Sequence, residues 1–203
     1  GLAALLADDD DAQARLDDLE RSGVFLTDVS DGGWYRYHAL FADLLRAGLR
    51  SRNPALVPEL HHRAALWLLA HAATTEAEFH ARLAGDWPLV GRLVCDRWLG
   101  AVLDDAELAS DPLAGTPPLA VADVPDLSLV AAARACSRGD RDEADLHRAR
   151  LDELLGPLRR STEDQPRTVH RRIVDLAHGW AFGAGARARD AAKALAGAGE
   201  PSP

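Results

Sequence analysis

The sequence is poor in methionine, lysine, cysteine and aromatic residues. It contains no methionine, one lysine (Lys193) and two cysteines, Cys95 and Cys136, which lie far apart and form no CxxC pair. This cysteine pattern indicates neither a disulfide framework nor a zinc site. Only 5% of the residues are aromatic, while alanine is abundant, and this balance favours helices over sheets. The composition therefore predicts a mainly helical protein.

Long apolar runs are missing as well. No run approaches the roughly 18 residues that a membrane-crossing helix requires, and no signal peptide opens the chain. We therefore expect a cytoplasmic protein without a membrane partner. Because the first residue is Gly1 and there is no initiator methionine, we also expect the chain to be a piece of a longer protein.

Positive charge is scarce relative to negative charge. The formal net charge is −9, which repels DNA unless the basic residues gather into one patch. In residues 1–52 the carboxylates outnumber the arginines, and the helix predicted over 39–52 has no Asn, Gln or Lys in its middle to read bases. We therefore expect no direct DNA binding by this piece.

The first 52 residues alternate between helical and extended patterns. Two helices are followed by a strand, a turn, a second strand and a third helix, at 2–6, 12–22, 24–29 (VFLTDV), 30–33 (SDGG), 34–37 (WYRY) and 39–52. This order predicts a small winged-helix domain over 1–52.

His38 lies on the boundary between the second predicted strand and the helix that follows it. After His38, apolar residues recur at helical spacing and form one stripe: Leu40, Phe41, Leu44, Leu45 and Leu49. A buried strand end favours an apolar residue at such a position, and a helix N-cap favours Ser, Thr, Asp or Asn. The histidine therefore fits neither common role.

From Pro54 onward the pattern is one helix after another. Apolar residues at helical spacing are separated by Gly-containing turns, often followed by an Asp that can cap the next helix. Repeated helical hairpins of this kind predict an α-solenoid of the tetratricopeptide (TPR) type. We expect a first helical-repeat segment over 53–109, a proline-rich linker over 110–126 and further hairpins over 127–203, with a final helical pair at 167–182 and 186–197.

Histidines and tryptophans are scattered along these helices rather than grouped. His61 and His62 are adjacent, so their side chains point about 100° apart on a helix and do not form a chelating pair. The tryptophans Trp67, Trp87, Trp98 and Trp180 fall in different segments, and we expect them to fill the core between hairpins. No metal site is predicted.

Motifs of known active sites are absent. The patterns GxxxxGK[ST], GxSxG and HExxH do not occur. The segment GAGARA (183–188) fits the dinucleotide fingerprint GxGxxA, but that fingerprint needs a preceding strand and an acidic residue about 20 positions later. Because the preceding residues are typical of a helix end and the chain is nearly finished, a helix–helix turn is the favoured interpretation. We therefore expect no catalytic residue and no cofactor in this piece.

One continuous segment carries a family pattern. Residues 17–87 contain a leucine-rich helix, a glycine, an apolar strand and a turn, then W/Y-R-Y-H-x-L-F-x-x-L-L and H-x-x-A-x-x-W. In this order they resemble the centre of the large ATP-binding LuxR-type transcriptional regulators, the MalT-like group. The resemblance implies a nucleotide-binding module before a winged helix, then a helical-repeat sensor and a C-terminal helix-turn-helix.

The resemblance also implies a role for His38. These signal-transduction ATPases are related to immune and apoptotic receptors whose winged helix carries an M-H-D motif, in which the histidine touches the phosphate end of bound ADP. Tyr37-His38-Ala39 occupies the corresponding place, but Tyr replaces Met and Ala replaces Asp, so only the histidine carries over. Arg36, Tyr37 and Arg46 are expected to contact the neighbouring nucleotide-binding module.

Elementary chemistry is compatible with that role. A histidine that opens a helix lies beside the unpaired N–H groups of the first turn, and together they suit an anion. Approach of a β-phosphate would favour the protonated imidazole. His38 as a simple cap, or as the partner of a nearby carbonyl, remains open.

The resemblance predicts a non-enzymatic regulatory and sensor segment of an ATP-dependent LuxR-family transcriptional regulator. ATP or ADP would be bound by the parent protein, an upstream nucleotide-binding module would be the partner in cis, and a small-molecule or protein inducer would bind the repeats. DNA would be reached only through a C-terminal helix-turn-helix outside this chain. The alternative is a stand-alone TPR-like interaction module without nucleotide switching. A further alternative keeps the switch but regulates a cyclase or kinase.

Overall fold

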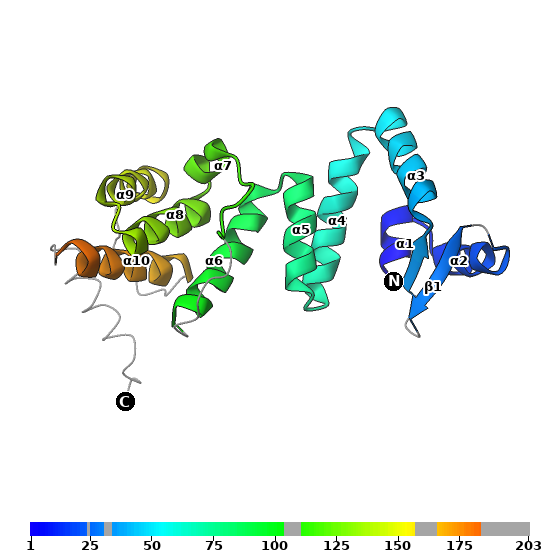
Figure 1. Cartoon of the computed structure of the whole chain (residues 1–203), viewed down its shortest axis with the longest axis horizontal. Helices are drawn as coiled ribbons and strands as arrows, with labels where there is room; N and C mark the ends of the chain where they lie inside the picture. The colour runs from blue at the N-terminus through cyan, green and yellow to red at the C-terminus, as the bar shows by residue number, and fades with distance from the viewer. Residues whose placement is uncertain (24, 31–33, 104–110, 157–165, 184–203) are drawn as a thin grey trace. The chain divides into compact units, whose positions relative to one another are not determined.

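The structure is a computed structural model that describes residues 1–23, 25–30, 34–103, 111–156 and 166–183. It is mainly helical with one two-stranded antiparallel hairpin, which confirms the predicted fold class (Figure 1). The chain divides into two compact units, Gly1–Asp86 and Trp87–Pro203. This division falls inside the predicted first helical-repeat segment, 53–109. Each unit is described by itself.

The N-terminal part of the first unit has the element order predicted for a winged helix. Its elements are α1 (Leu2–Ala7), α2 (Ala12–Arg21), β1 (Leu26–Ser30), β2 (Trp34–Tyr37) and α3 (Ala39–Arg52). Helix α2 packs on both α1 and β1. The hydroxyl of Tyr35 on β2 accepts a hydrogen bond from Gln13 at 3.0 Å and donates one to Asp17. These contacts fix the hairpin on α2.

The two strands pair in one register with a single irregularity. Leu26 lies opposite Tyr37, and Thr27 lies opposite Arg36, with a shift in register between Asp28 and Ser30. Leu26 is buried. The residues predicted to form the turn, 31–33, lie outside the described residues. The hairpin delivers the chain directly to the start of α3.

Helix α3 begins where the sequence predicts, but its apolar stripe is not covered. None of the described side chains of α3 is buried, and Leu40 and Leu44 are 76% and 66% exposed. Phe41 and Leu49 are half-buried. The helical periodicity therefore identified an apolar face correctly, although within the described part of this unit that face has little to pack against.

Helices α4 (Leu56–Ala70) and α5 (Thr74–Ala84) form a closely packed hairpin. Their contact face consists largely of small residues, which let two helix backbones approach: the buried alanines are Ala64, Ala65, Ala77 and Ala81. Arg63 of α4 pairs with Asp8 at 2.7 Å and thereby ties the hairpin to the end of α1. Trp67 is half-buried and stacks on His71, with ring centroids 3.7 Å apart.

The second unit is built around one central helix, α8. Its elements are α6 (Trp87–Leu103), α7 (Pro118–Asp123), α8 (Pro125–Arg138), α9 (Arg141–Leu155) and α10 (Pro166–Phe182). Helix α8 contacts each of the other four, and Leu127, Leu129 and Val130 on it are fully buried. Gly91 permits the approach of α6, because a Cβ atom there would lie 3.0 Å from Cγ1 of Val124.

Two expectations about this unit are wrong. The described part of the predicted linker, 111–126, is not extended throughout, since α7 and the first residues of α8 lie within it and Leu113 is buried. Pro118 and Pro125 open these helices, where proline is well tolerated because its missing N–H needs no partner. Trp180 does not fill the core, because its side chain is 93% exposed. Trp98 is buried, as expected.

Other predictions fall on residues that the structure leaves undescribed. These are most of the GAGARA segment (184–188), the predicted helix at 186–197 and the stretch 104–110. Among the described helices, none combines the length and the apolar character that crossing a membrane requires.

Candidate functional site

The junction between β2 and α3 presents the predicted histidine. The backbone of His38 is extended, with φ −53° and ψ 136°, and its carbonyl accepts the N–H of Ala42 at 2.9 Å, the first bond of α3. His38 is thus the N-cap residue. Its ring makes no capping hydrogen bond in the described part of the chain, and the residue is exposed. The imidazole therefore faces solvent beside the first-turn N–H groups, which have no intrahelical partner.

Three aromatic side chains surround this junction and, with His38, form what we call the aromatic cluster: Phe25, Tyr37, His38 and Phe41. The ring of Phe41 stacks on Phe25 at 5.3 Å and lies against Tyr37 at 5.6 Å between centroids. Phe25 is also tilted against the imidazole of His38 at 6.3 Å. Its carbonyl accepts the backbone N–H of His38 at 2.7 Å. The cluster joins the start of β1, the end of β2 and the first turn of α3.

The other predicted site residues lie on the same module but are not all brought together. Tyr37 belongs to the aromatic cluster. Arg36 precedes it on β2, opposite Thr27, and is exposed. Arg46 lies two turns further along α3, about 10 Å from its start, and pairs with Asp43 of the same helix at 3.1 Å. Part of its charge is thus balanced locally. Whether Arg36, Tyr37 and Arg46 contact a neighbouring module stays a prediction.

The chemistry available at the junction is anion binding rather than catalysis. An exposed imidazole and the positive end of the fourteen-residue helix α3 both favour negative charge. Asp43 in the second turn would oppose an anion, but its carboxylate is paired with Arg46 at 3.1 Å, so its charge is balanced in part.

Histidines elsewhere are paired in ways the sequence did not indicate. Nδ1 of His61 on α4 lies 2.9 Å from Nδ1 of His80 on α5. Burial lowers the pKa of both, and the charges of His80 and Arg50 lower the pKa of His61 further. Among the described residues, no three His, Cys, Asp or Glu side chains gather closely enough to hold a metal ion.

The two cysteines do not form an exposed nucleophile. Sγ of Cys95 lies 3.2 Å from Nδ1 of His170, but the thiol is buried. Burial also raises the pKa of the Cys136 thiol. Neither side chain has the exposed, electropositive surroundings of a reactive cysteine.

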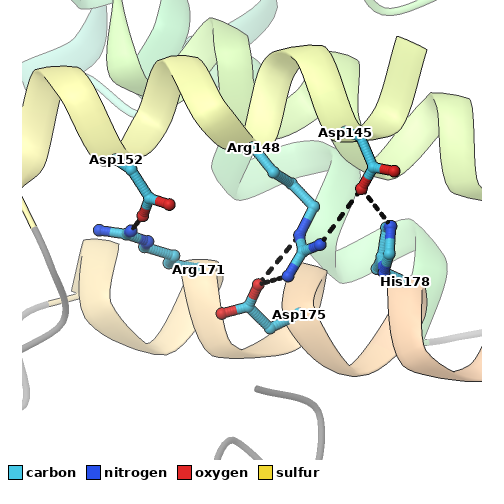
Figure 2. A network of polar contacts seen from close by, with 6 residues as sticks. All are labelled: Asp145, Arg148, Asp152, Arg171, Asp175 and His178. Atoms are coloured by element: carbon cyan, nitrogen blue, oxygen red, sulfur yellow. Dashed lines mark hydrogen bonds and ion pairs between the residues drawn. The ribbon is translucent and has the colours of Figure 1, made fainter. Parts of the chain in front are cut away.

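A second polar feature, which we call the charged ladder, joins α9 to α10 (Figure 2). Its contacts pair Arg141 with the carbonyl of Phe182, Asp145 with His178, Arg148 with Asp175, and Asp152 with Arg171. Successive ladder residues are four, three and four positions apart on α9, and their partners on α10 are separated by the same intervals in the opposite chain direction. Trp180 lies on the opposite face of α10, since it is rotated by about 200° from His178. This explains its exposure.

Sequence reasoning missed Phe25 and the charged ladder for different reasons. Phe25 was read only as an ordinary strand residue, and its positive φ of 54° leaves no mark in composition or periodicity. The ladder did leave a signal, namely charged residues at helical spacing on both helices. That signal gave no partner, because any solvated helix face carries a similar pattern.

The fold and the junction together define the class of the N-terminal part: a winged helix whose last helix opens with an exposed histidine. Residues 1–57 match the family of the MalT winged helix domain. This part of the chain is therefore similar to the MalT winged helix domain, which confirms the resemblance drawn from the sequence.

Curated relatives match stretches of about 80 to 90 residues of the chain. The transcriptional regulator MalT of Yersinia enterocolitica is 41% identical over 86 residues, which is 42% of this chain and 10% of the relative. The serine/threonine-protein kinase PknK of Mycobacterium tuberculosis is 39% identical over 87 residues, 42% of this chain and 8% of the kinase. MalT of Klebsiella pneumoniae is 38% identical over 79 residues, which is 38% of this chain and 9% of the relative.

The match is local in both directions. This chain spans a tenth or less of the length of these curated relatives. No solved structure matches it.

Proposed function

We propose that this chain is the central regulatory segment of a MalT-like, ATP-dependent transcriptional regulator of the LuxR family. In this proposal the winged helix couples the nucleotide state of an upstream module to inducer sensing on the helical repeats. Two observations support it: the match of residues 1–57 to the MalT winged helix, and the run of helical hairpins that follows.

The observation that carries the nucleotide role is the exposed imidazole of His38 at the first turn of α3. A phosphate held by the upstream module could meet both the ring and the helix N-terminus. The terminal phosphate of ADP favours the protonated imidazole. His38 thus stabilises the ADP-bound, inactive form of the parent, and exchange for ATP releases it.

The partners follow from the surfaces around this junction. Leu40 and Leu44 are largely exposed, and an apolar helix face of this kind is typical of a contact with another domain. The upstream nucleotide-binding module is the occupant we propose for this face, with Arg36, Tyr37 and Arg46 near its edge. The inducer binds the helical repeats, DNA is bound by a helix-turn-helix elsewhere in the parent, and the parent acts in the cytoplasm.

The test is the His38→Ala variant of the full-length parent. The rate of ADP dissociation should rise roughly 10- to 100-fold, because a hydrogen bond to a charged group contributes roughly 1.5–3 kcal/mol. Basal transcription of a reporter should rise with it. His71→Ala is the matched control, since His71 is an exposed histidine at the end of α4 and should leave ADP dissociation unchanged. An unaltered rate in the His38→Ala protein would refute the nucleotide role.

A second output has its own support. The PknK relative is a protein kinase that matches a stretch of similar length with similar identity, which supports a regulatory piece that controls a kinase instead of a promoter. The open reading frame on both sides of Gly1–Pro203 decides between the two outputs. A parent with no nucleotide-binding motif upstream would favour the stand-alone TPR-like interaction module.

A further inference from the structure

Phe25 occupies an unfavourable place in the winged helix. Its φ is 54°, a left-handed conformation in which a side chain crowds the backbone and which glycine adopts far more readily. Its ring is also 59% exposed. Residues held in such conformations concentrate at functional sites, because the surrounding structure must compensate for the strain.

What Phe25 contacts is the predicted sensor residue. Its carbonyl accepts the backbone N–H of His38 at 2.7 Å, and its ring lies against the imidazole at 6.3 Å, with the planes inclined by 59°. The same ring also stacks on Phe41 of α3, with centroids 5.3 Å apart and planes inclined by 29°. A single residue thus holds both the main chain and the side chain of His38.

The left-handed backbone conformation of Phe25 accompanies both contacts with His38, the backbone hydrogen bond and the ring contact. Gly23, two residues earlier, also has a positive φ of 68°. The carbonyl of Phe25 can then meet the chain leaving β2 while its ring reaches the first turn of α3. Tyr37 also contacts Phe41, with ring centroids 5.6 Å apart, so Phe41 itself has a second aromatic neighbour.

We infer that Phe25 is a positioning residue for His38. Its ring limits the rotamers of an exposed imidazole that makes no capping bond of its own in the described part of the chain. The imidazole is thereby held beside the first-turn N–H groups of α3 before any anion arrives. This inference rests on the proposed function for its purpose, whereas the restraint itself is a property of this chain alone.

The restraint is measurable by NMR in this chain, with His38→Gln used to assign the imidazole signals. Phe25→Gly removes the ring and relieves the positive φ of 54°, which offsets part of the packing lost against Phe41. The nuclear Overhauser contact between rings 25 and 38 should vanish and the His38 side-chain couplings should become averaged. Phe25→Tyr keeps the ring and should keep the couplings. Couplings that do not change in Phe25→Gly would overturn the inference.

The consequence is measurable in the full-length parent. Phe25→Gly should raise ADP dissociation roughly two- to tenfold, the range expected when one side chain must be ordered on binding, and Phe25→Tyr should not. In the Phe25→Gly, His38→Ala double variant the rate should equal that of His38→Ala alone. A normal rate in Phe25→Gly beside a raised rate in His38→Ala would also overturn the inference.

The two proposals fail separately. If His38→Ala leaves ADP dissociation unchanged, the nucleotide role is lost, while the NMR couplings in this chain still decide whether Phe25 restrains the imidazole. If the His38 couplings do not change in Phe25→Gly but His38→Ala still accelerates ADP dissociation, the nucleotide role is kept and the role of Phe25 is lost.

Discussion

At the residue scale, the charged pairs differ in how far their side chains are buried, and we expect the buried ones to contribute more to the free energy of unfolding. In the charged ladder, the side chains of Arg148 and Asp175 are only 12% and 7% exposed. The guanidinium donates to Asp175 through two nitrogens (Figure 2). Arg150 and Asp123 form a pair at 2.9 Å that is 37% and 53% exposed. Both are Arg–Asp pairs, but the first is largely buried and the second is exposed to solvent.

Removing one partner of the buried pair should be costly. Asp175→Ala leaves the Arg148 charge buried, which typically costs about 3–5 kcal/mol of unfolding free energy. We expect about 3 kcal/mol, because Asp145 lies 3.6 Å from the same guanidinium and compensates in part. Asp123→Ala, the exposed control, should cost less than about 1 kcal/mol. Denaturant unfolding measures both, and similar losses would show that the ladder is solvated.

At the element scale, the α4–α5 hairpin combines small apolar contacts with one titratable pair. The two Nδ1 atoms of His61 and His80, 2.9 Å apart, can share one proton but cannot both carry one without separating the rings. Burial first, and then the charges of His80 and Arg50, lower the pKa of His61. Burial lowers the pKa of His80 as well. The hairpin is therefore built for neutral imidazoles.

This pair predicts the direction of a pH dependence. Since both pKa values are lower in the folded hairpin than the unfolded value of about 6.5, the unfolded chain takes up protons more readily. The contribution to stability is fully present above about pH 6.5 and is lost as the pH falls below it. The wild-type unfolding free energy should drop more between pH 7.5 and 5.5 than that of a His61→Gln, His80→Gln variant.

A matched control keeps that comparison specific. His71→Gln changes a histidine at the end of α4 that is exposed, so its pH dependence should follow the wild type. If the double variant and the wild type lose the same free energy over this range, acid acts elsewhere and the hairpin does not depend on the pair.

At the scale of the whole molecule, the two compact units have unequal cores. Among the described residues of unit Gly1–Asp86, the buried apolar ones are five alanines and two leucines, Leu26 and Leu68. Unit Trp87–Pro203 buries many larger side chains, most of them along α6 and α8. Because the free energy of burial rises with the apolar area removed from water, the second unit should be the more stable one.

Amide hydrogen exchange measures this difference without separating the units. Amides in α8 should exchange most slowly, those in α4 and α5 faster, and those in α3, which has no buried described side chain, fastest of the helices compared. The difference in protection between α8 and α4 should be at least about tenfold, which corresponds to about 1.4 kcal/mol. Equal protection would mean that the units unfold as one.

The sequence predicted much of this at the level of elements. The hairpin, the start of α3 at Ala39 and the ends of helices at Gly85 and Gly139 agree with the structure, because turn chemistry and periodicity act over a few residues. Proline misled the prediction over 110–126, since composition does not tell whether a proline interrupts a helix or begins one. Pro118 and Pro125 begin helices here.

The candidate site shows the same division between local and distant information. His38 was identified from its place between a strand and a helix, which is a local feature. The sequence alone therefore determined the helical class, the order of elements and the boundary histidine, because short-range spacing and turn residues encode them. Only the tertiary structure decided that Phe25 lies against that histidine, that α9 and α10 meet through charges and that Trp180 faces outward. These facts depend on which side chains distant parts of the chain bring together, and pairing at a distance leaves no period in the sequence.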